Sequence, residues 1–481
     1  MPTGSIDRPN FVLIIADDMA WDDCGAFGNP IVKTPRLDSF AREGICFDRA
    51  FLTISSCSPS RASLLTGRYP HNTDADELHW PLPKEQSTFV EQLKQAGYWT
   101  AAAGKWHLGN QVRDRFDLIH EVDTSGFQLP SGTSGASGTF QESAVGEAKS
   151  GCTDWLRLLE LRPKDRPFFL WLAAVDPHRP YDKQISDSPH EPATVRLPPY
   201  HPDTDKVRAD YARYYNEIAR LDQYIGGVLD ELERQQLSRN TVVIFLSDNG
   251  RPFPRDKTTL YDSGIRTPLM IRWPVKISAG SRCEQLVSSV DIGPTILHLA
   301  GLPPDPKMDG RNFQNLLTQP DQSIRDYVFA EKNWHDFEDH SRAARSKQFK
   351  YIHNVYNDLP NTPPADAVRS PTYVEMKRLA TIGQLAHNQQ QCFVKPRPSE
   401  ELYDLKSDPF ELNNLSGSAK YQEELRIHRT ALAEWKQRTN DQIPKMRTAD
   451  EFDRVTGTPT AARRRPRWSK KRMVQAGLTA P

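Results

Sequence analysis

Apolar runs of strand length, separated by segments with helical patterns, most narrowly limit the fold of this chain. The runs are residues 11–15, 98–103, 168–175, 241–246 and 268–271. A continuous apolar run of this length is typical of a strand that is buried on both faces, as in a parallel sheet. Because such runs alternate with helical patterns, we predict an α/β fold with a large, mostly parallel sheet flanked by helices.

The longest helical pattern lies between the third and the fourth apolar run. Its apolar residues recur at steps of three or four, namely Tyr211, Tyr214, Ile218, Leu221, Ile225, Val228 and Leu232. This spacing predicts one buried stripe of a long amphipathic helix, with a packing role and no function of its own. Residues 125–151, rich in Gly, Ser and Thr, predict a long loop, and residues 192–205 predict a second irregular stretch.

The character of the sequence changes near residue 340. Residues 342–355 predict one strand with basic flanks, a polar insertion follows up to residue 398, and a last helix is predicted over residues 421–439. We therefore predict a large α/β domain over residues 1–340. Residues 341–481 are predicted to form a smaller α+β domain with a short antiparallel sheet and a basic tail. The tail predicts either a solvated extension or a segment that docks onto an acidic partner or subunit.

Composition excludes several classes of function. Lysine and arginine balance aspartate and glutamate, so the formal net charge is +0, which argues against a nucleic-acid or membrane-surface partner. Any positive potential for an anionic ligand must therefore be local. No segment is long and apolar enough to span a membrane.

Cysteine usage and the amino terminus suggest where the protein resides. The six cysteines are scattered without a C-x-x-C spacing, which argues against zinc and against a disulfide framework, although a single bridge stays open. The first apolar run is too short for a signal peptide and ends in acidic residues. As written, the sequence predicts a cytoplasmic protein, or a secreted or periplasmic one if a leader has been removed.

Polar side chains follow four of the apolar runs, at the point where each run ends. The four groups are Asp17-Asp18, Gly104-Lys105-Trp106-His107, Asp176-Pro177-His178 and Ser247-Asp248-Asn249-Gly250. The carboxyl ends of parallel strands face one crevice, where ligands bind. Taken alone, the acidic pair could cap a helix and the last group could form a plain turn. Together, the four groups predict one functional site.

The residue types at these ends indicate the chemistry. Carboxylates and an amide, without imidazole or thiolate, suit Ca²⁺ or Mg²⁺ better than zinc. Lys105, Lys257, Arg61 and two histidines add positive charge and protons. A divalent cation beside several cationic side chains suits a tetrahedral oxyanion whose charge is spread over several oxygens.

The segment Cys57-Ser58-Pro59-Ser60-Arg61 is the most specific motif of the chain. A short helix is predicted over residues 62–65, with Gly67 ending it. The cysteine is thus expected beside outward-pointing backbone N–H groups, where negative charge is favoured. The simpler interpretation is an ordinary thiol beside a turn.

The chain resembles formylglycine-dependent sulfatases of the alkaline phosphatase superfamily. The motifs that carry the resemblance are Arg8-Pro9-Asn10-Phe11, Asp17-Asp18, Thr34-Pro35-Arg36-Leu37-Asp38, C-S-P-S-R with Thr66-Gly67-Arg68, Gly104-Lys105-Trp106-His107-Leu108-Gly109, Ser247-Asp248-Asn249-Gly250, Lys257 through Pro268, Glu401-Leu402-Tyr403-Asp404-Leu405 and Asp408-Pro409-Phe410-Glu411. Residues 176–180 and 248–254 look most like the heparan N-sulfatase (N-sulfoglucosamine sulfohydrolase) branch. Lys257 departs from that branch, since some members carry arginine there.

The resemblance implies a role for each site residue. Cys57 becomes formylglycine through a formylglycine-generating maturation enzyme, and the hydrate supplies the nucleophilic hydroxyl. One calcium ion, with magnesium as the alternative, is held by Asp17, Asp18, Asp248, Asn249 and the modified residue 57. Arg61 and His107 hold and activate the hydrate, whereas Lys105, Lys257 and His178 bind the sulfate. His178, with Lys257 as a second donor, protonates the leaving group.

The resemblance also implies a sulfated saccharide as substrate and a place in glycosaminoglycan degradation. The N-sulfate of a terminal glucosamine is the leading candidate, and an O-sulfated sugar is second. The residues predicted to line the sugar pocket are Asp74, Glu77, His79, Trp80, Arg179 and Arg251, each of which could equally be a solvated loop residue. A homo-oligomer is left open.

Two other functions remain alternatives. A phosphonate or phosphate ester hydrolase can use the same metal and nucleophile. A non-catalytic protein that binds sulfated glycans would keep Cys57 as a thiol.

Overall fold

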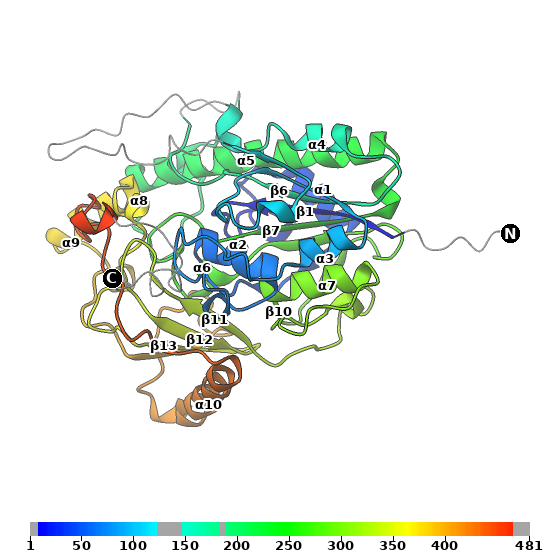
Figure 1. The fold of residues 1–481 in the computed structure, drawn as a ribbon. Helices are drawn as coiled ribbons and strands as arrows, with labels where there is room; N and C mark the ends of the chain where they lie inside the picture. Colours follow the sequence, from blue (N-terminus) through cyan, green and yellow to red (C-terminus); the bar gives the residue numbers. More distant parts are fainter. Residues whose placement is uncertain (1–7, 123–146, 183–187, 465–481) are drawn as a thin grey trace.

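A computed structural model of the chain describes residues 8–122, 147–182 and 188–464 (Figure 1). Its large sheet has eight strands in the order β5-β4-β6-β1-β7-β8-β2-β9. Their bounds are β1 Asn10–Ala16, β2 Ile45–Phe47, β4 Trp99–Gly104, β5 Leu118–Glu121, β6 Phe168–Ala173, β7 Thr241–Ser247, β8 Leu269–Arg272 and β9 Ser281–Cys283. The strands from β5 to β7 are parallel, and β8 is antiparallel to both of its neighbours. The predicted mostly parallel sheet is confirmed.

Helices cover both faces of this sheet, as Figure 1 shows. The bounds are α1 Pro35–Glu43, α2 Cys57–Thr66, α3 Phe89–Gln95, α4 Trp155–Leu161, α5 Asp205–Arg234, α6 Asp262–Ile265 and α7 Ile292–Leu299. Phe11, Leu13 and Ile15 of β1 pack in one core cluster with α2, α3 and α7. Val12 and Ile14 pack in the other cluster with α1, α4 and α5. Burial on both faces explains why β1 is apolar at every position.

Helix α5 confirms the longest helical pattern of the sequence. It begins after Thr204, whose side chain accepts a hydrogen bond from the backbone N–H of Val207, and its apolar stripe is buried. The loop predicted over residues 125–151 lies mostly outside the described residues. Residues 192–205 hold only a short 3₁₀ turn, Pro192–Thr194, before α5, in keeping with the predicted irregular stretch.

The second sheet is antiparallel, with four strands in the order β11-β12-β13-β14. Their bounds are β11 Val328–Lys332, β12 Ser341–Arg345, β13 Phe349–Asn354 and β14 Glu400–Asp404. Helix α10, Gln422–Thr439, packs against it and matches the predicted last helix. This sheet also includes β11, which lies before residue 341, where the smaller domain was predicted to begin. Two short strands, β3 Ala50–Phe51 and β10 Val287–Ser288, pair separately.

One local prediction in this region is wrong. Residues 342–355 form the hairpin β12–β13 rather than one strand, because Ser346 N–H donates to Phe349 O at 2.9 Å and closes a tight turn. The polar insertion after residue 355, for which the sequence predicted no elements, contains α8, Ala365–Val368, and α9, Pro371–Thr381. The side chain of Ser370 caps α9 by accepting from Tyr373 N–H.

Buried ion pairs join the small sheet to the rest of the chain. His71 Nδ1 lies 2.6 Å from Glu331 Oε1 on β11, and its Nε2 lies 3.1 Å from Thr439 O at the end of α10. Arg342 on β12 forms a two-pronged pair with Asp441 at 2.7 and 2.9 Å. Because these pairs are buried, removing one partner would leave an uncompensated charge inside the protein and destabilise the fold.

The stability contributed by His71 should depend on pH. Burial by itself lowers the pKa of His71, but Glu331 and Asp441 outweigh burial and raise the pKa above its ordinary value. The histidine therefore stabilises the fold fully below the unfolded pKa of about 6.5, and this contribution is lost as pH rises through the folded pKa. We expect His71→Gln to lower the free energy of unfolding more at about pH 5.5 than at about pH 8.5. Denaturant titrations at both pH values measure this, and an equal loss at both would contradict it.

Two further predictions can be compared with the described residues, and a third mostly cannot. All six cysteines are buried, and no disulfide joins any two of them in the described part of the chain. No helix in the described part of the chain is long and apolar enough to cross a membrane. Most of the predicted basic tail lies in residues 465–481, outside the described residues.

Candidate active site

The four polar groups that follow apolar runs lie at the carboxyl ends of β1, β4, β6 and β7. These strands are neighbours in the sheet, in the order β4-β6-β1-β7, and all run parallel. Because parallel strands end at the same edge, the side chains that follow them meet over a short distance. The charged side chains at this edge, among them Asp17, Asp18 and Asp248, are buried.

Cys57 lies at the centre of this crevice. It is the first residue of α2, which begins five residues earlier than the sequence predicted, and only 2% of Cys57 is exposed. Its Sγ lies 3.6 Å from Asp17 Oδ1 and 3.2 Å from Asn249 Nδ2. Burial raises the pKa of the Cys57 thiol to about 12, so the unmodified side chain stays protonated near neutral pH.

Three carboxylates surround the cysteine. Asp17, Asp18 and Asp248 are almost completely buried, and an oxygen each of Asp17 and Asp248 lies within 4.8 Å of the other and of Cys57 Sγ. Burial raises the pKa of Asp18 well above its ordinary value, and the neighbouring carboxylates raise it further. Three ionised carboxylates buried this close together repel one another, so the cluster is unfavourable unless positive charge is added.

The donor set fits a hard divalent cation. Asn249 Nδ2 donates to Asp18 Oδ1 at 3.0 Å and to Asp248 Oδ1 at 2.8 Å. Its Oδ1 is buried and has no hydrogen-bond partner among the described residues. Carboxylate and amide oxygens converging on one point are the ligands that calcium and magnesium prefer.

Cationic side chains pair with each carboxylate. Lys105 Nζ contacts Asp17 Oδ2, and Lys257 Nζ lies 2.7 Å from Asp18 Oδ2. Arg61 is fully buried; its Nε donates to Asp248 Oδ2 at 2.8 Å and its Nη1 donates to the Lys105 carbonyl at 2.9 Å.

Two predicted histidines lie at this crevice. His178 Nε2 is 3.7 Å from Asp18 Oδ2 and 3.9 Å from Asp366 Oδ2. Burial, reinforced by Lys257, lowers the pKa of His178 to about 3. His107 Nε2 lies 2.6 Å from His79 Nδ1, and its buried Nδ1 has no partner in the described part of the chain.

The residues after α2 that were predicted to line a sugar pocket differ in their surroundings. His79 contacts His107 and donates its backbone N–H to Ser58 Oγ at 2.7 Å, so it lies at the crevice. Glu77 accepts from Trp80 Nε1 at 3.0 Å and from a hydroxyl of the C-terminal segment, Thr448 Oγ1, at 2.9 Å. Asp74, by contrast, is exposed and accepts from Gln86 Nε2 at 3.4 Å.

The two arginines predicted for the same pocket are buried in internal ion pairs. Arg179 binds both oxygens of Asp210 at 2.8 and 2.7 Å and donates a third hydrogen bond to Pro252 O. Arg251 pairs with Asp22 and Asp23 at 2.5 and 2.9 Å. Both guanidinium groups are thus committed to the fold, which favours a structural role over the predicted substrate contact.

Residues from the second half of the chain also reach the crevice, and the sequence analysis missed them. Trp334 packs in a small cluster with Cys57 and Leu78. His335 Nδ1 lies 2.7 Å from Ser56 Oγ, and Asp366 on α8 faces His178. Trp334 and His335 follow β11, but Glu331, Lys332 and Asn333 separate them from its apolar residues, so the signal that identified the other groups was weak here. Asp366 carried no such signal.

Comparison with known proteins finds relatives over most of the chain. Residues 9–302 match the family described as Sulfatase, and residues 253–389 match the family described as N-sulphoglucosamine sulphohydrolase, C-terminal. An ulvan-active sulfatase of Formosa agariphila is 32% identical over 89% of this chain and 75% of its own length. The human N-sulphoglucosamine sulphohydrolase is 31% identical over 90% of this chain and 91% of its own length.

A solved structure supports the fold. BT4656, in complex with its substrate D-glucosamine-2-N,6-O-disulfate, superposes with a TM-score of 0.69 at 22% identity. The superposition covers 91% of this chain and 99% of that one. The architecture is that of the alkaline-phosphatase-like sulfatases. The chain therefore belongs to the sulfatase family of sulfuric ester hydrolases.

Proposed function

We propose that this sulfatase removes a sulfate group from a saccharide, with the N-sulfate of a terminal glucosamine as the leading substrate and an O-sulfate as the second. The observation that carries the chemistry is the placement of Cys57 at the start of α2 among three buried carboxylates and two lysines. The preference for the N-sulfate rests on the match of residues 253–389 and on the human relative, which aligns over nearly its full length.

Cys57 is proposed to act as formylglycine. Replacing the Cβ–S bond by an aldehyde is a two-electron oxidation, so it needs a maturation enzyme and an external oxidant such as molecular oxygen. The aldehyde hydrate supplies a hydroxyl nucleophile that a protonated, buried thiol does not. Ser58 Oγ accepts the backbone N–H of His79, which ties the first turn of α2 to the segment that follows the helix.

Asp17, Asp18, Asp248 and Asn249 are proposed to hold one calcium ion, with magnesium as the alternative. When bound, the ion supplies Lewis-acid stabilisation of negative charge on sulfate and nucleophile oxygens. Arg61 keeps Asp248 oriented through its 2.8 Å hydrogen bond. Lys105 and Lys257 extend from the sheet edge beside these carboxylates and are proposed to bind sulfate oxygens.

His178 is proposed to protonate the leaving group. Its Nε2 faces the crevice between Asp18 and Asp366, and the negative charge of a bound sulfate would raise the pKa of His178, which burial and Lys257 lower, so that the imidazole can carry the proton. We expect His178→Ala to lower kcat on a sugar sulfate by about 10²-fold or more, and kcat on a nitrophenyl sulfate much less, because a nitrophenolate leaves without a proton. Steady-state kinetics on both substrates measure this. An equal loss on both would reject the acid role and leave His178 as a sulfate ligand.

The substrate itself is tested by sulfate release. We expect turnover of N-sulfoglucosamine to exceed that of 6-O-sulfated N-acetylglucosamine, since the C-terminal part of the chain matches that branch. Ion chromatography of released sulfate measures both rates on the mature enzyme. No turnover of the first, with rapid turnover of the second, would reject the N-sulfate assignment and keep the sulfatase. Hydrolysis of a phosphonate and of a phosphate ester, measured in parallel, tests the alternative that the enzyme is a phosphonate or phosphate ester hydrolase.

A further inference from the structure

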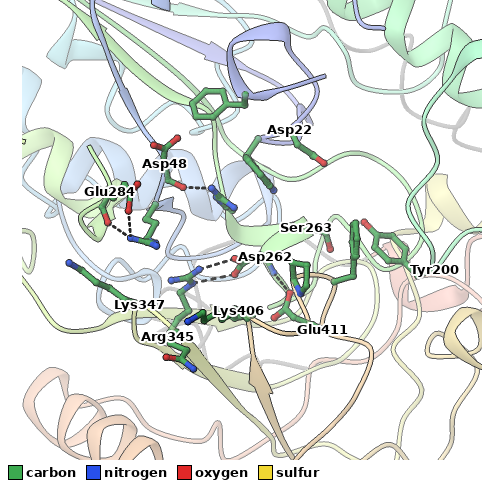
Figure 2. A pocket seen from close by; sticks show the side chains of 18 of the residues that line it. Asp22, Asp48, Tyr200, Asp262, Ser263, Glu284, Arg345, Lys347, Lys406 and Glu411 are labelled. Atoms are coloured by element: carbon green, nitrogen blue, oxygen red, sulfur yellow. Dashed lines mark hydrogen bonds and ion pairs between the residues drawn. The ribbon is translucent and has the colours of Figure 1, made fainter. Parts of the chain in front are cut away.

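A cavity of about 850 Å³ lies where the large sheet meets the small one, and we call it the interdomain pocket. Its walls come from residues 21–22 after β1, residues 262–263 at the start of α6, residues 345–348 in the β12–β13 turn and residues 405–411 after β14. Figure 2 shows Asp22 and Asp48 on one side and Arg345, Lys347 and Lys406 on the other. Among the described residues, none of those proposed for catalysis or metal binding lines it.

The acidic side chains of the interdomain pocket already have cationic partners. Asp22 pairs with Arg251, Asp48 with Arg282, Asp262 with Arg345, Glu284 with Arg49 and Glu411 with Lys350. Three of these partners, Arg251, Arg282 and Lys350, do not line the pocket themselves. The negative charge of the wall is therefore neutralised from within the protein.

Five cationic residues of the same wall have no such partner. Within the described part of the chain, no carboxylate forms an ion pair with Arg196, Arg255, Arg266, Lys347 or Lys406. Arg196 and Lys406 are exposed. The pocket thus carries excess positive charge although the chain as a whole is neutral.

Two of these arginines are held in place by aromatic rings. The Arg255 guanidinium lies between Tyr200 and Tyr261, 4.5 and 4.0 Å from the ring centroids. Arg255 is only 2% exposed, and its Nη1 has no hydrogen-bond partner among the described residues. The Arg266 guanidinium stacks on Trp21 at 3.4 Å, and burial lowers its pKa to about 10, which leaves it charged near neutral pH.

The unpaired guanidinium atom, the excess charge and the aromatic walls point to one ligand chemistry. Phe27 and Phe410 also line the pocket, and Phe410 is 38% exposed. Aromatic faces stack on the apolar faces of sugar rings, and guanidinium groups bind sulfate or carboxylate oxygens in pairs. The volume is within the range of pockets that enclose small-molecule ligands. We propose that the interdomain pocket is a non-catalytic site that binds a sulfated saccharide.

The test is a calorimetric titration with a heparin-derived disaccharide that carries N- and O-sulfates. The full chain with Cys57→Ala prevents hydrolysis during the titration. In this background we expect Arg196→Glu/Lys406→Glu to weaken one binding event by at least about 10-fold, because both cations are replaced by anions at the pocket. The affinity of that event should also fall as salt is raised.

Three controls make the result specific. Arg213→Glu/Lys276→Glu reverses two exposed charges outside the pocket and should leave the binding event unchanged. Thermal melting checks that both double variants fold. With Cys57 present, Arg196→Glu/Lys406→Glu should keep wild-type turnover of N-sulfoglucosamine, since neither residue lies in the catalytic crevice.

Two outcomes would overturn the proposal. One is an identical titration of the parent and of Arg196→Glu/Lys406→Glu. The other is equal or tighter binding of ATP or inorganic sulfate at the same event, which would show a general anion site. Absence of sulfate release by the mature wild-type enzyme would contradict the proposed function instead, because the calorimetric binding event does not depend on turnover.

Discussion

Replacing Cys57 by alanine is expected to abolish sulfate release while the fold is retained. Alanine lacks the sulfur whose release from Cβ accompanies oxidation to the aldehyde, so no nucleophile can form beside Asp17 and Asn249. We expect kcat to fall by at least about 10⁴-fold. Cys57→Ser should lose turnover as well, because a serine hydroxyl cannot form an aldehyde hydrate. Steady-state sulfate release and a thermal melt measure the two parts of this prediction.

A matched control and a mass measurement make the test decisive. Cys283→Ala removes another buried, free thiol that lies outside the crevice and should leave kcat unchanged. The mass of the peptide over residues 49–68 should show the wild-type cysteine converted to formylglycine. Full activity in Cys57→Ala, or full activity with an unmodified thiol, would contradict the proposed nucleophile. A wild-type chain that keeps the thiol and shows no turnover would instead support the glycan-binding alternative.

The second large effect is expected at the metal site. Asp248→Ala removes one of three clustered carboxylates and also the partner of the fully buried Arg61. We expect bound calcium and kcat to be lost together, because the remaining oxygens provide too few ligands for a hard divalent cation. Metal analysis by plasma mass spectrometry, in parallel with kinetics, measures both quantities on the same sample.

Loss of an ion-pair partner can also destabilise the fold, by about 3–5 kcal/mol for a buried pair. Asp248→Asn keeps the shape of the side chain, so it separates loss of charge from loss of packing. Asp222→Asn is the matched control, since Asp222 is a buried carboxylate that accepts backbone N–H groups of Arg36 and Leu37 away from the crevice. Unchanged calcium in Asp248→Ala, or zinc at one ion per chain in the wild type, would contradict the proposed site.

The sequence predicted the strands of the large sheet because burial on both faces leaves a continuous apolar signal. The run at 11–15 became β1 and the run at 98–103 became β4 with a shift of one residue. The same signal located the site, since polar residues that follow such runs must lie at one edge of a parallel sheet. Strand order was beyond this reasoning, because an apolar run does not record which neighbour it pairs with.

Ion pairs between residues that are distant in the sequence could not be predicted. Arg179 and Arg251 were expected to line the sugar pocket because each stands within a few residues of a catalytic group, and this stays a prediction. Their side chains meet Asp210 on α5 and Asp22 after β1, and no local pattern indicates those pairs. Asp366 was missed for the same reason, since its approach to His178 depends on how α8 packs against the large domain.

The hairpin β12–β13 and the helices of the insertion were missed for a different reason. Basic residues recur through both strands of the hairpin, and the turn at Ser346 contains neither glycine nor proline, so no turn signal divides the segment. Helix α9 has a capping serine and a proline at its first position, but its outer face is polar, which hid the helical periodicity.

The burial of Cys57 has a consequence for the order of events during protein synthesis. Its side chain is enclosed by Asn249 and Trp334, which leave the ribosome long after α2 has been made. A modifying enzyme must reach Cys57 before those later segments arrive and close over it, because only 2% of the residue stays exposed in the finished fold. Maturation would then compete with folding of the nascent chain, so faster folding would yield more unmodified enzyme. Slowing translation between residues 67 and 249 should therefore raise the fraction of modified protein without changing any amino acid.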